Sequence, residues 1–229
     1  MGGAIAIFVK TPGRSALKTR LASTLGAEFA THWYSLAAGA VAAVTREATR
    51  ARRAHAYWAV AESEALDDPR WGGLAVIAQG RGGLGARMQR VHAELCERHG
   101  AAILLGADSP QVDTGLLIRA LDWLTAPEAR LAFGPARDGG FWLFGGNRPL
   151  RTHDWESVAY SAPGTGAQFR ALVEGSGDWL TLPALGDVDT GADVLDCLSA
   201  LEALPSRLPV QETLRAWMAK RLPAKDPAE

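Results

Sequence analysis

The 229-residue sequence predicts an α/β fold with a mostly parallel central sheet, and three observations support this prediction. Short apolar segments alternate with longer segments of helical periodicity through residue 125. Residues 101–105 (AAILL) are apolar without polar alternation, which is typical of a strand covered on both faces. No internal repeat or linker interrupts the chain. We therefore expect a single domain over residues 1–222 and a flexible tail at 223–229.

The first half of the chain divides into elements at its turn signals, such as KTPG after the first apolar run and Gly26 after a short helical segment. In order, strands are expected at 3–9, 54–59, 74–78 and 101–105, and helices at 17–25, 27–52 and 85–98. Parallel strands linked by helical crossovers follow from this order.

The second half carries capping signals and a pair of short strands. Asp113 or Thr114 is expected to cap a leucine-rich helix, and Thr165 and Thr190 each precede a further helical run in a capping pattern. Strands are expected at 130–133 and 141–144. The denser loops after residue 134 suggest that substrate-binding segments lie in this half.

Composition and charge exclude several classes of protein. The formal net charge is −1, whereas a nucleic-acid-binding surface usually needs a basic excess. No apolar stretch approaches the ~20 residues of a membrane span, and the N-terminus lacks the features of a signal peptide. Cys96 and Cys197 lie far apart without metal-binding spacing, which favours a reducing compartment. We therefore expect a cytoplasmic protein without a nucleic-acid partner or a membrane span; its oligomeric state is not predicted.

Residues 80–85 (GRGGLG) match the dinucleotide pattern G-x-G-x-x-G between an expected strand and an expected helix. Asp108 follows roughly twenty residues later, where the ribose-binding acid of a dehydrogenase would lie. However, this loop is the third strand-to-helix junction, and a nicotinamide site does not require the acidic loops downstream. The glycines either serve a ligand or only permit a tight turn, and a dehydrogenase is a minor alternative.

Four basic residues follow the first strand, namely Lys10, Arg14, Lys18 and Arg20. They lie beside the start of a helix, whose free backbone N–H groups attract anions. In an open parallel sheet, ligands bind beyond the carboxyl ends of the strands. This position favours phosphate binding over a set of merely solvated bases, although the P-loop pattern is absent.

Acidic residues follow two other expected elements. Asp108 comes directly after the strand at 101–105, and Asp189 lies in GDVDT before a helix. Their oxygens suit Mg²⁺ or Mn²⁺, which keeps open positions for substrate phosphates. Asp108 could instead form an Asx-turn before Pro110. Because Asp187 and Asp189 alternate along a short extended piece, only one of them is expected to face the site.

The segment GPARDGGFWL joins the expected strands at 130–133 and 141–144. Asp138-Gly139-Gly140 can form a simple hairpin turn. The glycines also allow backbone N–H groups to approach a ligand closely, and Asp138 could orient or deprotonate an acceptor hydroxyl. Both interpretations stay open at this point.

Five motifs occur in order between Ile5 and about Leu198. They are KTPG-x4-KTRLA, QG-x-G-x-LG-x-RM, G-x-DSP, GPA-x-DGGF-x-L-x-G and DVDT-x-x-D. Together they resemble the DUF2064 family of glycosyltransferases, small proteins of the nucleotide-diphospho-sugar transferase superfamily. The resemblance implies a GT-A-like three-layer α/β/α sandwich, in which the glycine loop shapes a nucleotide pocket.

The resemblance also implies roles for individual residues. Asp108 and Asp189 match the acids on the metal side of the site, and Asp138 matches the acid of the D-G-G motif. Phe141 stands where a tyrosine is more usual, and Gly106 stands where a D-x-D motif has its first acid. With the basic loop included, the expected nucleotide- and phosphate-binding residues are Lys10, Gly13, Lys18, Arg20, Gly82, Gly85 and Arg87. The expected acceptor region comprises Gly139, Gly140 and Trp155.

The expected function is transfer of a sugar from a nucleotide-diphospho-sugar to an unidentified acceptor, assisted by Mg²⁺ or Mn²⁺. Nucleotidylyl transfer with release of pyrophosphate, as in a 2-phospholactate guanylyltransferase, is the first alternative, because the same acids and cation would serve it. A non-catalytic nucleotide-binding protein is a further alternative. The sequence identifies neither the base nor the sugar nor the acceptor.

Overall fold

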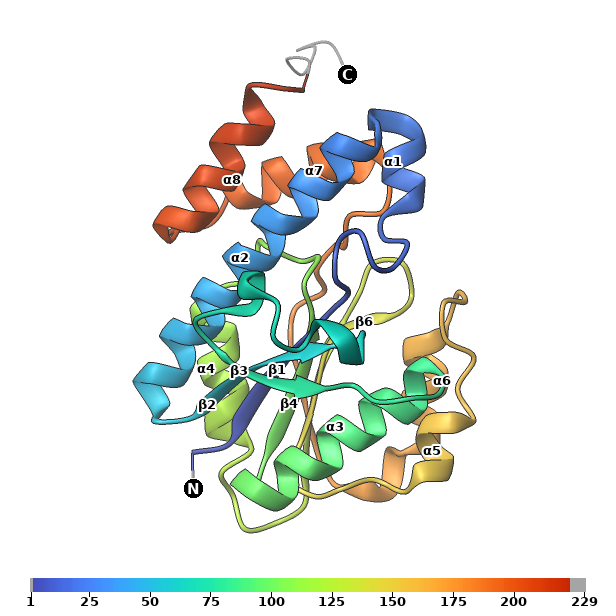
Figure 1. Cartoon of the computed structure of the whole chain (residues 1–229). Helices are drawn as coiled ribbons and strands as arrows, with labels where there is room; N and C mark the ends of the chain where they lie inside the picture. The colour runs from blue at the N-terminus through green and yellow to red at the C-terminus, as the bar shows by residue number, and fades with distance from the viewer. Residues whose placement is uncertain (1, 223–229) are drawn as a thin grey trace.

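The computed structural model describes residues 2–222, in which helices cover both faces of a seven-stranded sheet (Figure 1). The strands are β1 (Ala4–Val9), β2 (His55–Val60), β3 (Ala75–Ala78), β4 (Ala102–Gly106), β5 (Arg130–Pro135), β6 (Phe141–Gly146) and β7 (Asp178–Thr181). Their order is β3-β2-β1-β4-β6-β5-β7, and among these strands only β6 runs antiparallel to its neighbours. This confirms the expected α/β fold with a mostly parallel sheet. The tail expected at 223–229 lies outside the described residues.

Two groups of helices form the outer layers, as Figure 1 shows. The helices α2, α4, α7 and α8 contribute to one apolar cluster, and α3, α5 and α6 contribute to a second cluster on the opposite face. The helices of the described residues are α1 (Thr19–Leu25), α2 (Ala27–Arg52), α3 (Leu84–His99), α4 (Thr114–Trp123), α5 (Thr152–Glu156), α6 (Thr165–Leu172), α7 (Gly191–Glu202) and α8 (Pro209–Ala219). Short 3-10 turns lie at Ser63–Ala65, Pro69–Trp71 and Glu174–Ser176. The architecture is therefore a three-layer α/β/α sandwich.

The central strand β1 takes part in both halves of the core because successive side chains point to opposite faces. Ile5, Ile7 and Val9 belong to the cluster with α2, whereas Ala4 and Ala6 belong to the cluster with α3. None of the five is more than 2% exposed. Burial on both faces explains why this strand is apolar throughout.

The helix caps agree with the sequence at two of three positions. The Asp113 carboxylate accepts a hydrogen bond from the Gly115 N–H at 2.7 Å and caps α4, and Thr190 forms a reciprocal capping box with Asp193 at α7. The prediction for Thr165 is wrong, because Gly164, with a φ of 86°, occupies the cap position of α6. Glycine adopts this left-handed backbone without steric cost.

Three elements lie where no element was expected, namely β7, α5 and α8. The edge strand β7 has four residues, all at least partly exposed, so its sequence lacks a clear apolar pattern.

Residues 136–140 form the connection of the antiparallel β5–β6 hairpin, as one interpretation of the D-G-G segment predicted. No helix within residues 2–222 is long and apolar enough to cross a membrane.

Candidate functional site

A cleft of about 1000 Å³ lies beyond the carboxyl ends of the parallel strands. Val9 at the end of β1, Gln79 after β3 and Gly106 at the end of β4 line it. The β5–β6 hairpin and the segment before α6 form its other side. Ligands of open α/β sheets bind at this edge, so the cleft is the candidate binding site.

Lys18 lies at the centre of the charged part of the cleft. Its Nζ is 2.8 Å from Oδ2 of Asp108 and 3.0 Å from Oδ1 of Asp189, and the Lys18 side chain is only 8% exposed. Burial by itself lowers the pKa of the Lys18 ammonium, but the two carboxylates outweigh this effect and raise the pKa above its ordinary value. The structure thus brings both expected metal-side acids onto one cationic side chain.

The backbone of Lys18 is left-handed, with φ 45° and ψ 43°, at the residue that precedes α1. Such a conformation is uncommon for a residue with a side chain and is found preferentially at functional sites. Arg20, the second residue of α1, is 77% exposed, and its Nη1 lies 3.7 Å from Oδ2 of Asp189. One guanidinium and one ammonium therefore reach the same acid from the N-terminal loop.

Asp187 and Asp189 both line the cleft, contrary to the prediction that only one of them faces the site. Residues 186–189 form no regular strand, so the alternation of side chains between two faces does not apply to them. Burial raises the pKa of Asp187 to about 6, and the nearby carboxylates of Asp108 and Asp138 act in the same direction. The cleft therefore collects four acids, and the pKa of one of them, Asp187, lies above the ordinary range of a carboxylate.

Hydrogen bonds fix the acidic segment against the loop after β4. The carbonyl oxygen of Gly186 accepts from Ser109 Oγ at 3.2 Å and from Gln111 Nε2 at 2.5 Å. The Arg137 N–H donates to the Leu185 carbonyl oxygen at 3.0 Å, which joins the same segment to the hairpin. These contacts explain how three stretches distant in sequence present their acids to one cleft.

The N-terminal basic loop is anchored by residues that the sequence analysis did not identify. Glu62 is 9% exposed and accepts hydrogen bonds from the Thr11 N–H and from Ser15 Oγ. The Tyr34 hydroxyl, from α2, accepts from the Lys10 N–H at 2.9 Å. Lys10 lines the cleft, whereas Gly13 lies in the turn of this loop with a φ of 84° and does not. The sequence gives no local signal of this anchoring, because Tyr34 lies in an apolar helix and Glu62 is an isolated acid.

The glycine loop contributes to the cleft only in part. Gly82, with a φ of 104°, lines the cleft, and Arg87 lines it while its Nε donates to the Gly82 carbonyl oxygen at 2.9 Å. Gly85 instead serves packing, because a Cβ there would lie 2.3 Å from the backbone oxygen of Trp155. Gln79, 4% exposed, donates from Nε2 to the carbonyl oxygens of Val9 and Ala59 at 3.1 and 2.9 Å. Both side-chain amide hydrogens of Gln79 are thereby used, and its backbone carbonyl oxygen accepts from Arg90 Nη1 at 2.7 Å.

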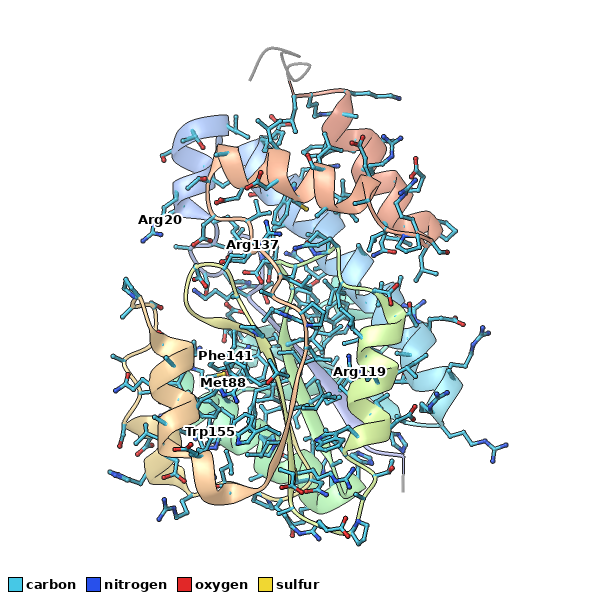
Figure 2. The ribbon with its side chains drawn as sticks, turned by 180° about the vertical axis from the view of Figure 1, so that it is seen from behind. Arg20, Met88, Arg119, Arg137, Phe141 and Trp155 are labelled. Atoms are coloured by element: carbon cyan, nitrogen blue, oxygen red, sulfur yellow. The ribbon has the colours of Figure 1, made fainter. Side chains whose placement is uncertain are left out.

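Trp155 does not reach the cleft, so its expected acceptor role needs correction. The side chain is 0% exposed and packs edge-on against Phe144 and tilted against Phe169. In Figure 2, Trp155 lies inside the layer of α5 and α6, below Met88 and Phe141, while Arg20 extends freely from α1. A fully buried indole cannot contact an acceptor, so its role is structural.

The D-G-G loop combines a turn with an exposed acid. Asp138 and Gly140 line the cleft, and Oδ1 of Asp138 accepts from the Gly140 N–H at 2.8 Å. Gly139 has a φ of 90°, and its carbonyl oxygen accepts from the Gly166 N–H at 2.8 Å, which docks the loop on α6. The turn leaves Oδ2 of Asp138 available to the cleft.

The donor set fits a divalent cation with few protein ligands. Among residues 2–222, no group of three or more His, Cys, Asp or Glu side chains is arranged to hold a metal ion. Asp108 and Asp189, however, already share one cationic group, the Lys18 ammonium. Two carboxylates are enough for Mg²⁺ or Mn²⁺ where water and substrate phosphates supply the other ligands.

Comparisons with known proteins identify a family for the chain. The profile of a family described as "Uncharacterized protein conserved in bacteria (DUF2064)" matches residues 41–162. A search of curated proteins found no match to the sequence.

Solved structures share the fold. A provisionally assigned nucleotide-diphospho-sugar transferase from Desulfovibrio desulfuricans G20 is similar with a TM-score of 0.77 and 24% identity, over 95% of this chain and 97% of the other. A CMP:2-keto-3-deoxy-manno-octonic acid synthetase complexed with CTP is similar with a TM-score of 0.52 and 14% identity, over 96% and 100% of the two chains. A 4-diphosphocytidyl-2C-methyl-D-erythritol synthase from Anaerococcus prevotii DSM 20548 is similar with a TM-score of 0.53 and 9% identity, over 88% and 97%. At these identities the likeness establishes the fold.

Proposed function

The chain belongs to the DUF2064 family, and we propose that it is a transferase that binds a nucleotide-diphospho-sugar in the cleft and passes the sugar to an acceptor hydroxyl. The observation that carries the proposal is the convergence of Asp108 and Asp189 on Lys18 at the sheet edge. A cleft of about 1000 Å³ is large enough for a nucleotide-sugar together with part of an acceptor.

The basic side chains of the cleft would bind the diphosphate. Lys10, Arg20 and Arg87 line the cleft from two different segments, and Lys18 lies between the acids. Guanidinium and ammonium groups form charge-assisted hydrogen bonds to phosphate oxygens, which are stronger than neutral ones. Gln79 also lines the cleft, and its side-chain oxygen would accept an N–H of the base.

Asp108 and Asp189 would hold Mg²⁺ or Mn²⁺ next to the diphosphate. When bound, the cation supplies charge that offsets the charge developing on the departing nucleoside diphosphate. Asp138 would accept the proton of the acceptor hydroxyl as that oxygen attacks the anomeric carbon. Its exposed position in the hairpin, where it lines the cleft, supports this assignment.

Nucleotidylyl transfer is the second candidate, because the same acids and bases could activate the α-phosphate of a nucleoside triphosphate. The chain shares its fold with the CMP:2-keto-3-deoxy-manno-octonic acid synthetase and the 4-diphosphocytidyl-2C-methyl-D-erythritol synthase. This likeness supports nucleotidylyl transfer as the second candidate. Product analysis separates the two reactions: sugar transfer releases a nucleoside diphosphate, whereas nucleotidylyl transfer releases pyrophosphate.

Binding is tested by thermal unfolding with UDP-, GDP- and dTDP-sugars and with CTP and GTP, each with Mn²⁺ or with a chelator. A ligand at about 100 times its Kd stabilises by roughly 2.7 kcal/mol, so we expect a rise in Tm of about 5 °C or more. Asp108→Asn should abolish the Mn²⁺-dependent part of this rise. The matched control is Asp196→Asn, which changes an exposed acid of α7 outside the cleft. The absence of any nucleotide-linked shift in the wild type would contradict the proposal.

A further inference from the structure

The Lys18 ammonium occupies the position at which a cation would meet Asp108 and Asp189. It contacts both carboxylates directly, while the acids themselves are 33% and 44% exposed at their side chains. We propose that Lys18 is an internal counter-ion that closes this carboxylate pair to divalent cations until an anionic ligand draws its ammonium away. The inference deepens the proposed function and rests on its assignment of the two acids to a cation.

Electrostatic repulsion prevents the Lys18 ammonium and a divalent cation from contacting Asp108 and Asp189 at the same time. A divalent ion bound to both carboxylates would lie within a few ångströms of the ammonium, and like charges at that distance repel strongly in a partly buried site. The ammonium has the advantage of being tethered, so it is present at a high effective concentration. In the ligand-free protein, the Lys18 ammonium therefore already offsets part of the negative charge of the two carboxylates.

The backbone of Lys18 indicates that this contact is specifically maintained. A left-handed conformation at a residue with a side chain persists only where surrounding contacts determine it. On its N-terminal side, the loop is anchored through Thr11 and Ser15 to Glu62, and on its C-terminal side α1 begins. The two ion pairs of Lys18 hold the stretch between these anchors.

A diphosphate can draw the Lys18 ammonium away from Asp108 and Asp189. Its oxygens offer the ammonium an alternative anionic partner, and Arg20, 77% exposed, can meet the incoming anion first. Once the ammonium has turned to the phosphate, both carboxylates are free for a divalent ion. The arrangement thus predicts that nucleotide binds before the metal, and that the metal alone binds weakly.

The test measures the binding of Mn²⁺ alone to the full-length chain, by electron paramagnetic resonance of free Mn²⁺ and by calorimetry, without nucleotide. Lys18→Met should bind Mn²⁺ at least 10-fold more tightly than the wild type, because the carboxylates are then unpaired. Lys10→Met is the matched control for Mn²⁺ affinity, since Lys10 lines the same cleft but contacts neither acid. It should change the Mn²⁺ affinity less than 3-fold.

Equal or weaker Mn²⁺ binding by Lys18→Met would overturn the inference, as would an equal gain in Lys10→Met. Lys18→Gly provides a second variant, because it also removes the ammonium and suits the left-handed backbone if the Met variant is poorly folded. Circular dichroism and Tm establish folding of each variant. The inference and the proposed function fail separately: nucleotide-linked stabilisation of the wild type tests the function, whereas the Mn²⁺ affinities test the counter-ion.

Discussion

Glu62 accepts a hydrogen bond from the backbone N–H of Thr11 at 2.8 Å, across a separation of 51 residues. Its other carboxylate oxygen accepts from Ser15 Oγ. One acid, two residues beyond the end of β2, therefore holds both ends of the turn that precedes Lys18. The basic loop is a constrained structure and not a flexible flap, which is why its charges can be placed before a ligand arrives.

Glu62→Gln should weaken this anchor. The amide offers one acceptor oxygen where the carboxylate offers two, and charge-assisted bonds become neutral ones, so we expect a loss of about 1–2 kcal/mol in the free energy of unfolding. Urea unfolding measures this loss. Glu64→Gln, at an exposed neighbour, should change stability by less than about 0.5 kcal/mol. If the two variants unfold alike, the anchor does not contribute to stability.

Gly85→Ala tests the packing of α3 against the segment of Trp155. The new Cβ would meet the Trp155 backbone oxygen at 2.3 Å, and backbone atoms cannot move aside cheaply. We expect a destabilisation of about 1–3 kcal/mol, typical of overpacking. Gly83→Ala is the control, because nothing lies within 4 Å of its added Cβ and its φ of −67° suits alanine. A neutral Gly85→Ala would show that α3 can shift freely.

His92 should make the protein less stable as the pH falls below neutrality. Burial beside Cys96, Phe144 and Trp155 lowers the pKa of His92 from 6.5 to about 3. Between pH 6.5 and pH 3, His92 is protonated in the unfolded chain but stays neutral in the folded protein. Stability is therefore lost as the pH falls through 6.5 towards 3. From pH 7 to pH 5 this loss amounts to about 2 kcal/mol.

His92→Gln remains neutral and should lack this part of the pH dependence, although its absolute stability will be lower. Urea unfolding at pH 5, 6 and 7 gives the comparison. His153→Gln, at an exposed histidine of α5, should follow the wild type at every pH. Parallel pH profiles for the wild type and His92→Gln would refute the assignment.

Asp138→Asn tests the proposed role of the hairpin acid. Asparagine retains an oxygen for the Gly140 N–H, so the turn and the nucleotide affinity should be preserved. Without a carboxylate to accept the proton, the rate of sugar transfer should fall by about 100-fold or more. Release of nucleoside diphosphate, measured with the donor found by thermal unfolding, gives the rate. A transfer rate close to that of the wild type would remove Asp138 from the mechanism.

Much of the fold could be predicted because its signals are local. The expected helix at 27–52 has the observed bounds of α2, and most of the expected strands differ from the observed ones by one or two residues at either end. Apolar periodicity and caps such as Asp113 and Thr190 act within a few residues of where they occur. The edge strand β7 and the short helix α5 carry weaker patterns, and their structure depends on neighbouring elements.

By itself, the sequence determined the α/β class, the order of most elements and the kinds of side chain that follow each strand. Only the tertiary structure decided which of these side chains meet: Lys18 contacts acids 90 and 171 residues away, Glu62 anchors the basic loop, and Trp155 turns into the core. Local patterns specify backbone conformation, because they act through neighbouring residues. Contacts between distant side chains depend instead on how the layers pack, and no single stretch of the chain encodes that arrangement.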